Sequence, residues 1–349
     1  MNVLLTCAGR RNYLVRFFQQ VLGDRGQVFA ADVRVDAPAL QEADRAFIVP
    51  PVNHSGYFDI LLRLCRQHGV RLLIPLNDLE LPLLARERAR FLEAGVLPVV
   101  SSPEVINTCF DKWATLGFLK GCGLTAPKTY LSLAEAREAL SRGYLTFPLV
   151  VKPRWGTASI GIEYPGDDEE LELACRLVKK SLPRTLLAEV SAADPERCII
   201  IQQRLQGQEH GLDVINDLKG RYVCTLVRRK LSMRAGETDR AVTVRDAQLE
   251  ALGETIGRRL GHIANLDCDV FVLEEKYYVL EMNPRFGGGY PFSHVAGANL
   301  PGALIAWANG EEPDASCFRV KANVMSSKCD RLVVIDETRH ARSRRAFAD

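Results

Sequence analysis

The stretch Tyr277-Tyr278-Val279-Leu280-Glu281-Met282-Asn283-Pro284-Arg285 largely decides how this chain folds. It is an apolar strand with two polar side chains, Glu281 and Asn283, at its end. Because residues two apart on a strand point to the same face, these two side chains are predicted to project together, and Arg285 follows at the same spacing. An acid inside so apolar a run rarely faces bulk water without a partner, which disfavours an edge hairpin with solvated charges.

A second apolar run, residues 269–273, precedes this strand, and a short Glu-Glu-Lys turn connects the two. The pair is predicted to form a β-hairpin, in which Asp269 can lie beside Glu281 and Asn283. Carboxylate and amide oxygens suit a hard cation such as Mg²⁺, which proteins hold with a few such ligands plus substrate phosphates. The hairpin therefore predicts a metal site, and the Arg285 guanidinium could bind phosphate oxygens.

Two lysines on other elements strengthen this interpretation. Lys152 ends the apolar strand Leu149-Val150-Val151 and is followed by a glycine-containing loop, residues 156–161, and Lys112 begins a helical stretch. A lysine at a strand end before such a loop is typical of phosphate binding. Each lysine alone would more often be a surface charge, but beside a metal site the pair becomes credible.

A third segment, residues 202–209, reads Gln-Gln-Arg-Leu-Gln-Gly-Gln-Glu. An apolar strand leads into it, its backbone could meet a flat heterocycle, and a carboxylate follows seven residues after Gln202. By itself it is no more than a loop with a charge.

Two further segments could select a substrate. Arg228 and Lys230 fall on one face if their segment is a strand, where they could receive a carboxylate, although a solvated charged loop explains them about as well. Gly287, Gly288 and Gly289 allow a ligand to approach the backbone closely, and they also form the turn that leaves the strand. His210 and His294 are given no catalytic role, since a lone histidine is more often packed or exposed.

Composition restricts the remaining possibilities. The 349 residues contain 45 Lys and Arg against 43 Asp and Glu, so no dominant positive field favours nucleic acid. The arginine-rich end, residues 339–345, is interpreted as a solvated tail. The ten cysteines show no zinc-like spacing. A disulfide framework is not expected in a chain of this size, which favours a reducing cytoplasm, and neither a signal peptide nor a membrane span is expected.

The chain alternates between fold types along its length. Short apolar strands and amphipathic helices alternate over the first hundred or so residues, which predicts a parallel, doubly wound sheet. Hairpin patterns dominate after residue 205, including one around the turn 216–220. We expect an N-terminal α/β domain at 1–110, a lid at 111–204, a C-terminal domain at 205–320 and an extension at 321–349.

Taken in order, these motifs resemble the ATP-grasp superfamily. The closest likeness is to the synthetase halves of the carbamoyl phosphate synthase large subunit and to stand-alone ligases built like them. It rests on Lys112, on Val-Val-Lys-Pro at 150–153, on the small-residue loop, on the segment ending at Glu209, and on Asp269 with Glu-Met-Asn-Pro-Arg at 281–285. It covers roughly residues 1 to 310. The family implies an α/β fold of three lobes, a parallel N-terminal domain, a small lid and an antiparallel C-terminal domain, with ATP clamped between two antiparallel sheets.

The resemblance also implies roles for residues. Lys112 and Lys152 would hold ATP phosphates, beneath the loop that contains Gly156, Ser159 and Gly161. Arg285 would stabilise charge on the transferred phosphoryl group. The adenosine would meet Gln202, Gln203, the backbone of Leu205 and, at the ribose, Glu209, while Mg²⁺, with Mn²⁺ as an alternative ion, would bind Asp269, Glu281 and Asn283.

The implied reaction is ADP-forming ligation of a carboxylate to an amine through an acyl phosphate, with an amino acid or small peptide as the leading substrate. Two features depart from the synthetase pattern: Gln202 stands where many relatives have Glu, and Asp269 where carbamoyl phosphate synthase has Gln. The chain is about half of the two-synthetase arrangement, so we do not expect it to make carbamoyl phosphate. Ligases of this shape often pair, which is compatible with a homodimer.

Three other functions compete with this interpretation. A nicotinamide-dependent oxidoreductase is disfavoured, because residues 6–12 contain one glycine where a dinucleotide fingerprint needs three. A small-molecule kinase would keep the ATP site and leave a stable phosphoester. A nucleotide sensor without activity is disfavoured because the expected metal and phosphate positions are all filled by suitable residues.

Overall fold

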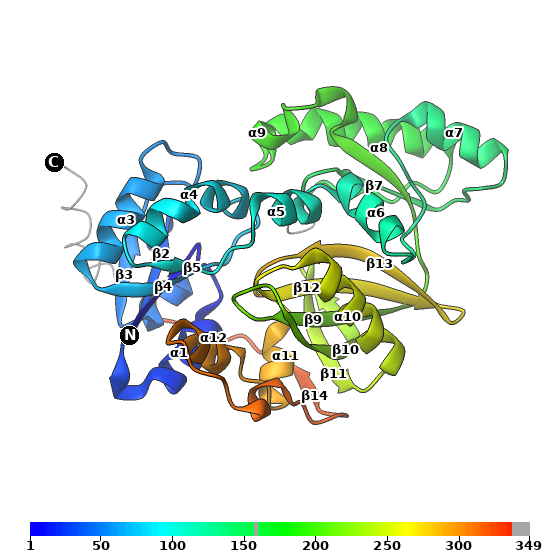
Figure 1. Cartoon of the computed structure of the whole chain (residues 1–349). Coiled ribbons are helices and arrows are strands. Elements are labelled where there is room, and N and C mark those ends of the chain that lie inside the picture. The colour runs from blue at the N-terminus through cyan, green and yellow to red at the C-terminus, as the bar shows by residue number, and fades with distance from the viewer. Residues whose placement is uncertain (157–159, 337–349) are drawn as a thin grey trace.

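The computed structural model describes residues 1–156 and 160–336, which form three lobes (Figure 1). The N-terminal lobe is a parallel sheet with the order β3-β2-β1-β4-β5, as the alternation of strands and helices predicts. Its strands are β1 (Asn2–Thr6), β2 (Val28–Asp32), β3 (Arg45–Ile48), β4 (Val70–Pro75) and β5 (Leu97–Pro98). Its helices are α1 (Asn12–Leu22), α2 (Pro38–Glu42), α3 (Tyr57–Gln67) and α4 (Leu81–Glu93).

The central strand β1 is buried on both faces, which explains its unbroken apolar sequence. Val3 and Leu5 join an apolar cluster that includes α1 and the C-terminal helix α12 (Leu300–Ala308). Leu4 points the other way, into a cluster with α3 and α4. The first cluster also contains Phe286, so the N-terminal and C-terminal lobes share one core.

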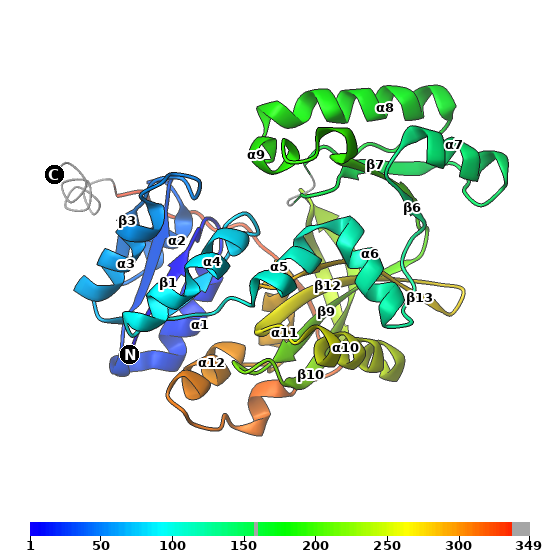
Figure 2. The ribbon, with the colours of Figure 1, turned by 45° about the horizontal axis from the view of Figure 1, so that its top comes forward.

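The middle lobe is a small antiparallel sheet with the order β6-β8-β7, formed by β6 (Thr129–Tyr130), β7 (Leu149–Pro153) and β8 (Ile199–Gln203). Helices α7 (Leu133–Ser141) and α8 (Asp168–Ser181) lie on its outer side, and the short α9 (Ala188–Ser191) follows them (Figure 2). Helix α7 begins with a capping box between Ser132 and Glu135, which satisfies two backbone donors at its start.

The C-terminal lobe is a six-stranded sheet with the order β13-β12-β9-β10-β11-β14. Both predicted hairpins are present, one from β9 (Gln208–Asn216) and β10 (Tyr222–Arg234), the other from β12 (Ala264–Leu273) and β13 (Lys276–Asn283). The remaining strands are β11 (Glu237–Val244) and β14 (Met325–Ser327), and the remaining helices are α10 (Ala247–Leu260) and α11 (Tyr290–Val295).

Two connecting helices, α5 (Pro103–Phe110) and α6 (Lys112–Gly121), link the N-terminal lobe to the sheet of the middle lobe, which is the expected lid. Cys109 and Leu119 pack into the same apolar cluster as α10, β12 and β13, so both helices rest on the C-terminal sheet. The expected boundary at 110/111 falls between them, and the one at 204/205 falls in the connection between β8 and β9. Strand β14 lies within the expected extension 321–349 and pairs with β11. Residues 337–349, with the arginine-rich stretch, lie outside the described residues.

Within the described part of the chain, no helix is long and apolar enough to cross a bilayer.

Two helical glycines provide a test of this packing. A Cβ at Gly253 of α10 would lie 2.3 Å from the Thr225 hydroxyl oxygen on β10, whereas a Cβ at Gly117 of α6 would meet no atom within 4 Å. We therefore expect Gly253→Ala to lower the free energy of unfolding by about 1–3 kcal/mol through overpacking. Gly117→Ala should raise it by up to about 1 kcal/mol, because alanine favours the helix. Urea unfolding of both variants measures this, and equal effects would contradict the packing of α10 on β10.

Candidate nucleotide and metal site

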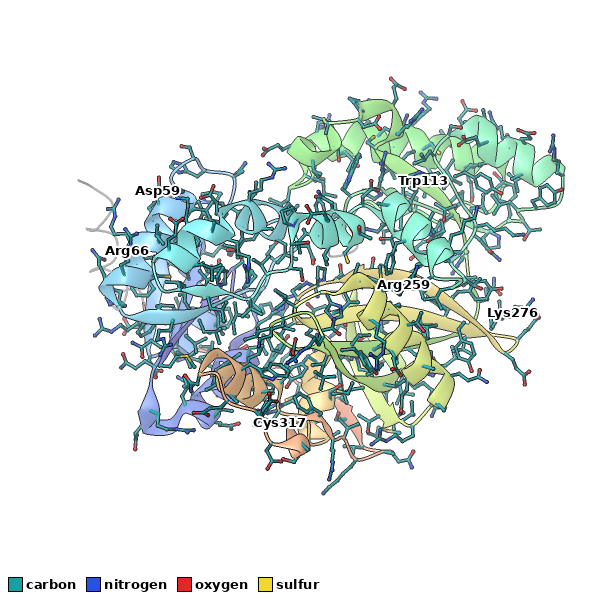
Figure 3. All side chains as sticks on the ribbon, viewed as in Figure 1. Asp59, Arg66, Trp113, Arg259, Lys276 and Cys317 are labelled. Atoms are coloured by element: carbon teal, nitrogen blue, oxygen red, sulfur yellow. The ribbon has the colours of Figure 1, made fainter. Side chains whose placement is uncertain are left out.

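The end of β13 brings oxygen ligands together. Asp269 lies directly opposite Glu281 in the β12–β13 pairing, and Asp267 lies opposite Asn283. The Asn283 side-chain amide donates to Glu281 Oε1 at 3.4 Å, so these two side chains share a face, and Glu281 remains one-third exposed. Lys276 marks the far tip of the same hairpin in Figure 3. The acids and the amide therefore gather at the end of the hairpin opposite its turn.

Two lysines reach this edge from other elements. Lys112 begins α6, and its Nζ lies 3.1 Å from the Gly156 carbonyl oxygen and 4.0 Å from Glu281 Oε2. Lys152 is buried on β7, and within residues 1–156 and 160–336 its ammonium has no hydrogen bond or ion pair. Burial and the charge on Lys112 lower the pKa of Lys152 to about 8, while Glu281 and Asp269 act in the opposite direction. An unpaired buried ammonium is costly, which makes this position suited to an anion.

The end of β7 and the start of α6 are locked together. The Arg154 guanidinium donates two hydrogen bonds to the Asp111 carboxylate, at 2.8 and 2.6 Å, and the Lys112 N–H donates to the Arg154 carbonyl at 3.2 Å. Asp111 also caps α6 by accepting from the Trp113 N–H. The two candidate phosphate-binding lysines are thus held by neighbouring residues in one rigid joint.

A third lysine lies deeper, between two of the predicted ligands. The Lys230 Nζ on β10 is 2.6 Å from Glu209 Oε1 and 2.7 Å from Asp269 Oδ1. Burial acts to lower the pKa of Lys230, but Asp269 and Glu209 more than offset it and hold the pKa above its usual value. Burial raises the pKa of Asp269 to about 7. Lys230 acts in the opposite direction, and the negative charges of Asp267, Glu281 and Glu209 add to the rise. The negative charge of these acids therefore favours the binding of a further cation.

Arg285 and Arg228 belong to a buried network of ion pairs. Arg285 makes a two-pronged pair with Asp78, at 2.9 Å for both contacts, and lies 3.4 Å from Asp267. Arg228 contacts Asp267 at 2.7 Å and the fully buried Asp213 at 2.6 Å. Asp78 follows β4 of the N-terminal lobe, so this network joins that lobe to the C-terminal sheet.

Gly287 and Gly289, which follow β13, leave space for the side chains of this network. A Cβ at Gly287 would lie 2.0 Å from the Asp267 carboxyl carbon, and one at Gly289 would lie 2.1 Å from the Arg228 guanidinium. The groups that approach these glycines closely are therefore charged side chains of the protein itself, Asp267 and Arg228. Arg228 and Lys230 share a face of β10, as a strand requires, and both are buried on internal acids, so the solvated-loop explanation is wrong for them.

The predicted adenine segment follows β8. The Gln202 amide donates to the Thr129 hydroxyl at 2.9 Å, and Gln203 Oε1 accepts from the Lys128 N–H at 3.4 Å. Both side chains therefore contact the segment at the start of the neighbouring strand β6. Leu205 is half-buried in the connection to β9, where Glu209 stands. A Cβ at Gly207 would meet the Val272 carbonyl at 2.4 Å, which fixes this connection against β12.

The predicted loop over the phosphates is described in part. The Gly156 carbonyl accepts from Lys112, and Gly161 has a φ of +67°, a conformation that favours glycine. Ser159, which was predicted to contribute to the same loop, lies outside the described residues.

The donor set fits a magnesium ion better than a softer metal. The side chains that converge at the edge are Asp269, Glu281 and Asn283, all oxygen ligands, and burial, together with the neighbouring acids, raises the pKa of Asp269. Mg²⁺ prefers such ligands together with phosphate oxygens. The described residues contain no cluster of three or more His, Cys, Asp and Glu side chains at metal-binding distance, so protein ligands alone would not enclose the ion.

Comparison with known proteins agrees with this geometry. Residues 3–100 match the PylC-like N-terminal domain, and residues 196–328 match the family described as ATP-grasp in the biosynthetic pathway with Ter operon. The chain therefore contains a PylC-like N-terminal domain and an ATP-grasp domain. The expected family is thereby confirmed.

Curated and solved ATP-grasp relatives are distant. The carbamoyl phosphate synthase large chain of Mycobacterium bovis is 25% identical over 220 residues, which are 60% of this chain and 18% of that protein. This chain thus matches about a fifth of the length of that relative. The biotin carboxylase domain of Hydrogenobacter thermophilus 2-oxoglutarate carboxylase, in complex with MgADP, ADP and bicarbonate, aligns over 93% of this chain and 73% of its own, at 16% identity and a TM-score of 0.72. The L-amino acid ligase from Bacillus licheniformis aligns over 91% of this chain and 77% of its own, at 18% identity and a TM-score of 0.64. These two structures share the fold.

Sequence reasoning missed several residues of this candidate site. Asp78 lies 207 residues along the chain from Arg285, and no local pattern marks it. Asp213 lies 15 residues before Arg228, on the neighbouring strand of the β9–β10 hairpin. Asp267 could have been found, because it stands two residues before Asp269 on the same strand face. His210 is buried against its own strand and His294 stacks on Phe17, at 3.6 Å between ring centroids, so both histidines are packed.

The pair between Arg285 and Asp78 generates a prediction. Asp78→Asn leaves a buried guanidinium without its main counter-charge, and we expect the free energy of unfolding to fall by about 3–5 kcal/mol. The matched control is Asp59→Asn, which removes an exposed partner of Arg90 on the outer surface of α3 (Figure 3) and should cost less than about 1 kcal/mol. Urea unfolding measures both, and similar losses would contradict the central role of the Arg285 pair.

Proposed function

We propose that this ATP-grasp chain is an ATP- and Mg²⁺-dependent ligase that joins a carboxylate to an amine through an acyl phosphate. The observation that carries the proposal is the meeting of two lysines with an acid and an amide at one edge. Lys112 lies 4.0 Å from Glu281, Asn283 lies 3.4 Å from the same carboxylate, and Lys152 is buried nearby without a described partner. Such an edge complements a polyphosphate with its cation.

The first step would activate the carboxylate. One of its oxygens attacks the γ-phosphorus of ATP, the bond to the β–γ bridging oxygen breaks, and ADP leaves. Lys112 and Lys152 would hold the phosphates in line and neutralise their charge, which is the main requirement of phosphoryl transfer. Asp269, Glu281 and Asn283 would hold Mg²⁺, which supplies further positive charge to the phosphate oxygens when bound.

The second step would form the amide bond. The uncharged amine attacks the acyl carbon, inorganic phosphate leaves, and the nitrogen releases a proton. No side-chain nucleophile is needed. Arg285 would stabilise the negative charge of the acyl phosphate, from a position fixed by Asp78 and Asp267. Exclusion of water by the lid would protect the intermediate from hydrolysis.

The adenosine would lie between the lid sheet and the C-terminal sheet. The Leu205 backbone, Gln202 and Gln203 would face the base, and Glu209 would accept hydrogen bonds from the ribose hydroxyls. The likeness to an L-amino acid ligase supports an amino acid or small peptide as one substrate. Mn²⁺ is proposed as a substitute ion, and pairing of two chains as a homodimer is compatible with the proposal.

The test is nucleotide turnover with pooled substrates. Purified protein with Mg²⁺, ATP, amino acids and small carboxylates should release ADP and phosphate only when both a carboxylate and an amine are present. Glu281→Gln should lower the rate at least about a hundredfold, because metal and phosphate positioning are lost. Glu311→Gln, which removes an exposed carboxylate after α12, is the matched control and should keep the wild-type rate. Release of ADP with a lasting phosphoester would instead identify a kinase.

The pKa of Lys152 gives a second prediction for this site. Because burial and Lys112 lower the pKa of Lys152 to about 8, its ammonium loses the proton in the free protein above this pH. Binding of a phosphate must then recover the proton, so the affinity for MgADP should fall by about tenfold per unit above pH 8. Lys152→Arg stays charged and should show a flatter profile. Titration calorimetry from pH 7 to 9.5 measures this, and identical profiles would contradict a phosphate contact by Lys152.

A further inference from the structure

Glu237 is a carboxylate beside the candidate site that the two proposed steps leave unused. It begins β11, directly after a turn of two residues, Ala235 and Gly236, whose φ values of +50° and +77° are typical of a tight hairpin. A Cβ at Gly288 would lie 3.1 Å from the Glu237 carboxyl carbon. Gly288 follows Arg285 by three residues, so the hairpin holds Glu237 against the segment that carries Arg285.

Glu237 already binds one ammonium group. The Lys328 Nζ, just after β14, lies 2.8 Å from Glu237 Oε2, and the Glu237 side chain is 57% exposed. A carboxylate can accept from more than one ammonium, because its two oxygens together offer about four lone-pair positions. Glu237 is therefore accessible to a further cationic group, such as the ammonium of a substrate.

Arg11 offers a hydrogen-bond donor near the same segment. Its guanidinium donates to the Leu76 carbonyl oxygen, two residues before Asp78, the partner of Arg285. The Arg11 Nε is buried and has no hydrogen-bond partner among the residues that the structure describes. A buried N–H without an acceptor is costly, so this position favours the arrival of an oxygen ligand.

The Tyr13 side chain shows that these groups are neighbours. Burial raises the pKa of Tyr13, and the positive charge of Arg11 acts against this rise. The negative charge of Glu237 adds to the rise, and Arg285 opposes it. Because such effects weaken with distance and are screened by water, all three charges lie near this phenol. An acid and an arginine with an unused donor thus gather beside Arg285.

We infer that Arg11 and Glu237 select the acid substrate of the ligase, an α-amino acid whose carboxylate is bound by Arg11 and whose ammonium is bound by Glu237. The two groups of an α-amino acid stand on adjacent carbon atoms and carry opposite charges, as do the two side chains that would receive them. The inference rests on the proposed function and narrows it, because it assigns the amino acid to the step in which a carboxylate is phosphorylated. Arg285 would then stabilise the acyl phosphate formed from that carboxylate.

The experiment compares two pools of acids. The full chain is incubated with Mg²⁺, ATP and hydroxylamine, which attacks an acyl phosphate to give a hydroxamate and phosphate, so that no amine substrate has to be known. One pool contains the common amino acids, and the other contains the same acids with hydrogen in place of the α-ammonium. We expect ADP and hydroxamate to form at least about tenfold faster from the amino acids, because only they make the charged hydrogen bond to Glu237.

Variants then assign this preference to Glu237. Glu237→Gln should lower the rate with the amino acid pool at least about tenfold, so that the two pools react at similar rates. Glu237→Asp keeps the charge and should keep part of the preference. Glu275→Gln, at the exposed tip of the β12–β13 hairpin, is the matched control and should keep the wild-type preference.

The outcomes separate the inference from the proposed function. Equal rates from the two pools on the wild-type chain, a faster reaction of the acids without ammonium, or an unchanged preference in Glu237→Gln overturns the inference alone. If neither pool releases ADP but titration calorimetry shows that the chain binds MgATP, the acid substrate is of another class, which also overturns the inference alone. Absence of MgATP binding overturns the proposed function and the inference with it.

Discussion

The salt bridge between Arg285 and Asp78 is the contact on which the arrangement of this site depends. Asp78 belongs to the loop after β4, and Arg285 follows the strand that presents Glu281 and Asn283, so one pair fixes the N-terminal sheet against the strand end that carries the predicted metal ligands. A guanidinium in contact with two acids has little freedom to rotate. The apolar cluster that includes Phe286 places the lobes together without fixing their orientation, and the directional ion pair supplies that orientation.

Charge balance explains much of the unusual sequence around this pair. Asp213 and Asp267 are buried beside Arg228, and glycines are required at 287 and 289 because any side chain would occupy the space of these charges. Breaking such a network is costly, since each member compensates another. The same reasoning applies one strand away, where Lys230 balances Glu209 and Asp269. Arg228, Arg285 and Lys230 are therefore paired with acids before any ligand binds, whereas Lys152 has no described partner.

The sequence predicted the features that depend on local periodicity. The alternation of strands and helices gave the parallel N-terminal sheet, and the spacing of two residues placed Glu281 and Asn283 on one face of β13. Lys112 and Lys152 were found because each stands at the end of a regular element. The partner of Arg285 was not found, since Asp78 is 207 residues away and only tertiary packing brings the two together. Glu209 and Asp269 were named as candidate ligands, but their pairing with Lys230 was not expected. Glycines 287 and 289 were recognised as sites of close approach, but a pattern cannot reveal which group approaches.

These observations suggest why the lid carries one of the lysines. Lys112 is held near Glu281 by the joint between Asp111 and Arg154, whereas Lys152 lies on the lid sheet and lacks a described partner. A buried ammonium without a counter-charge favours any state in which an anion arrives. A polyphosphate between the lid and the C-terminal sheet would supply that anion and would attract both lobes at once. Under the proposed function, lid closure would draw on the free energy of phosphate binding, because the Lys152 ammonium has no partner among the described residues.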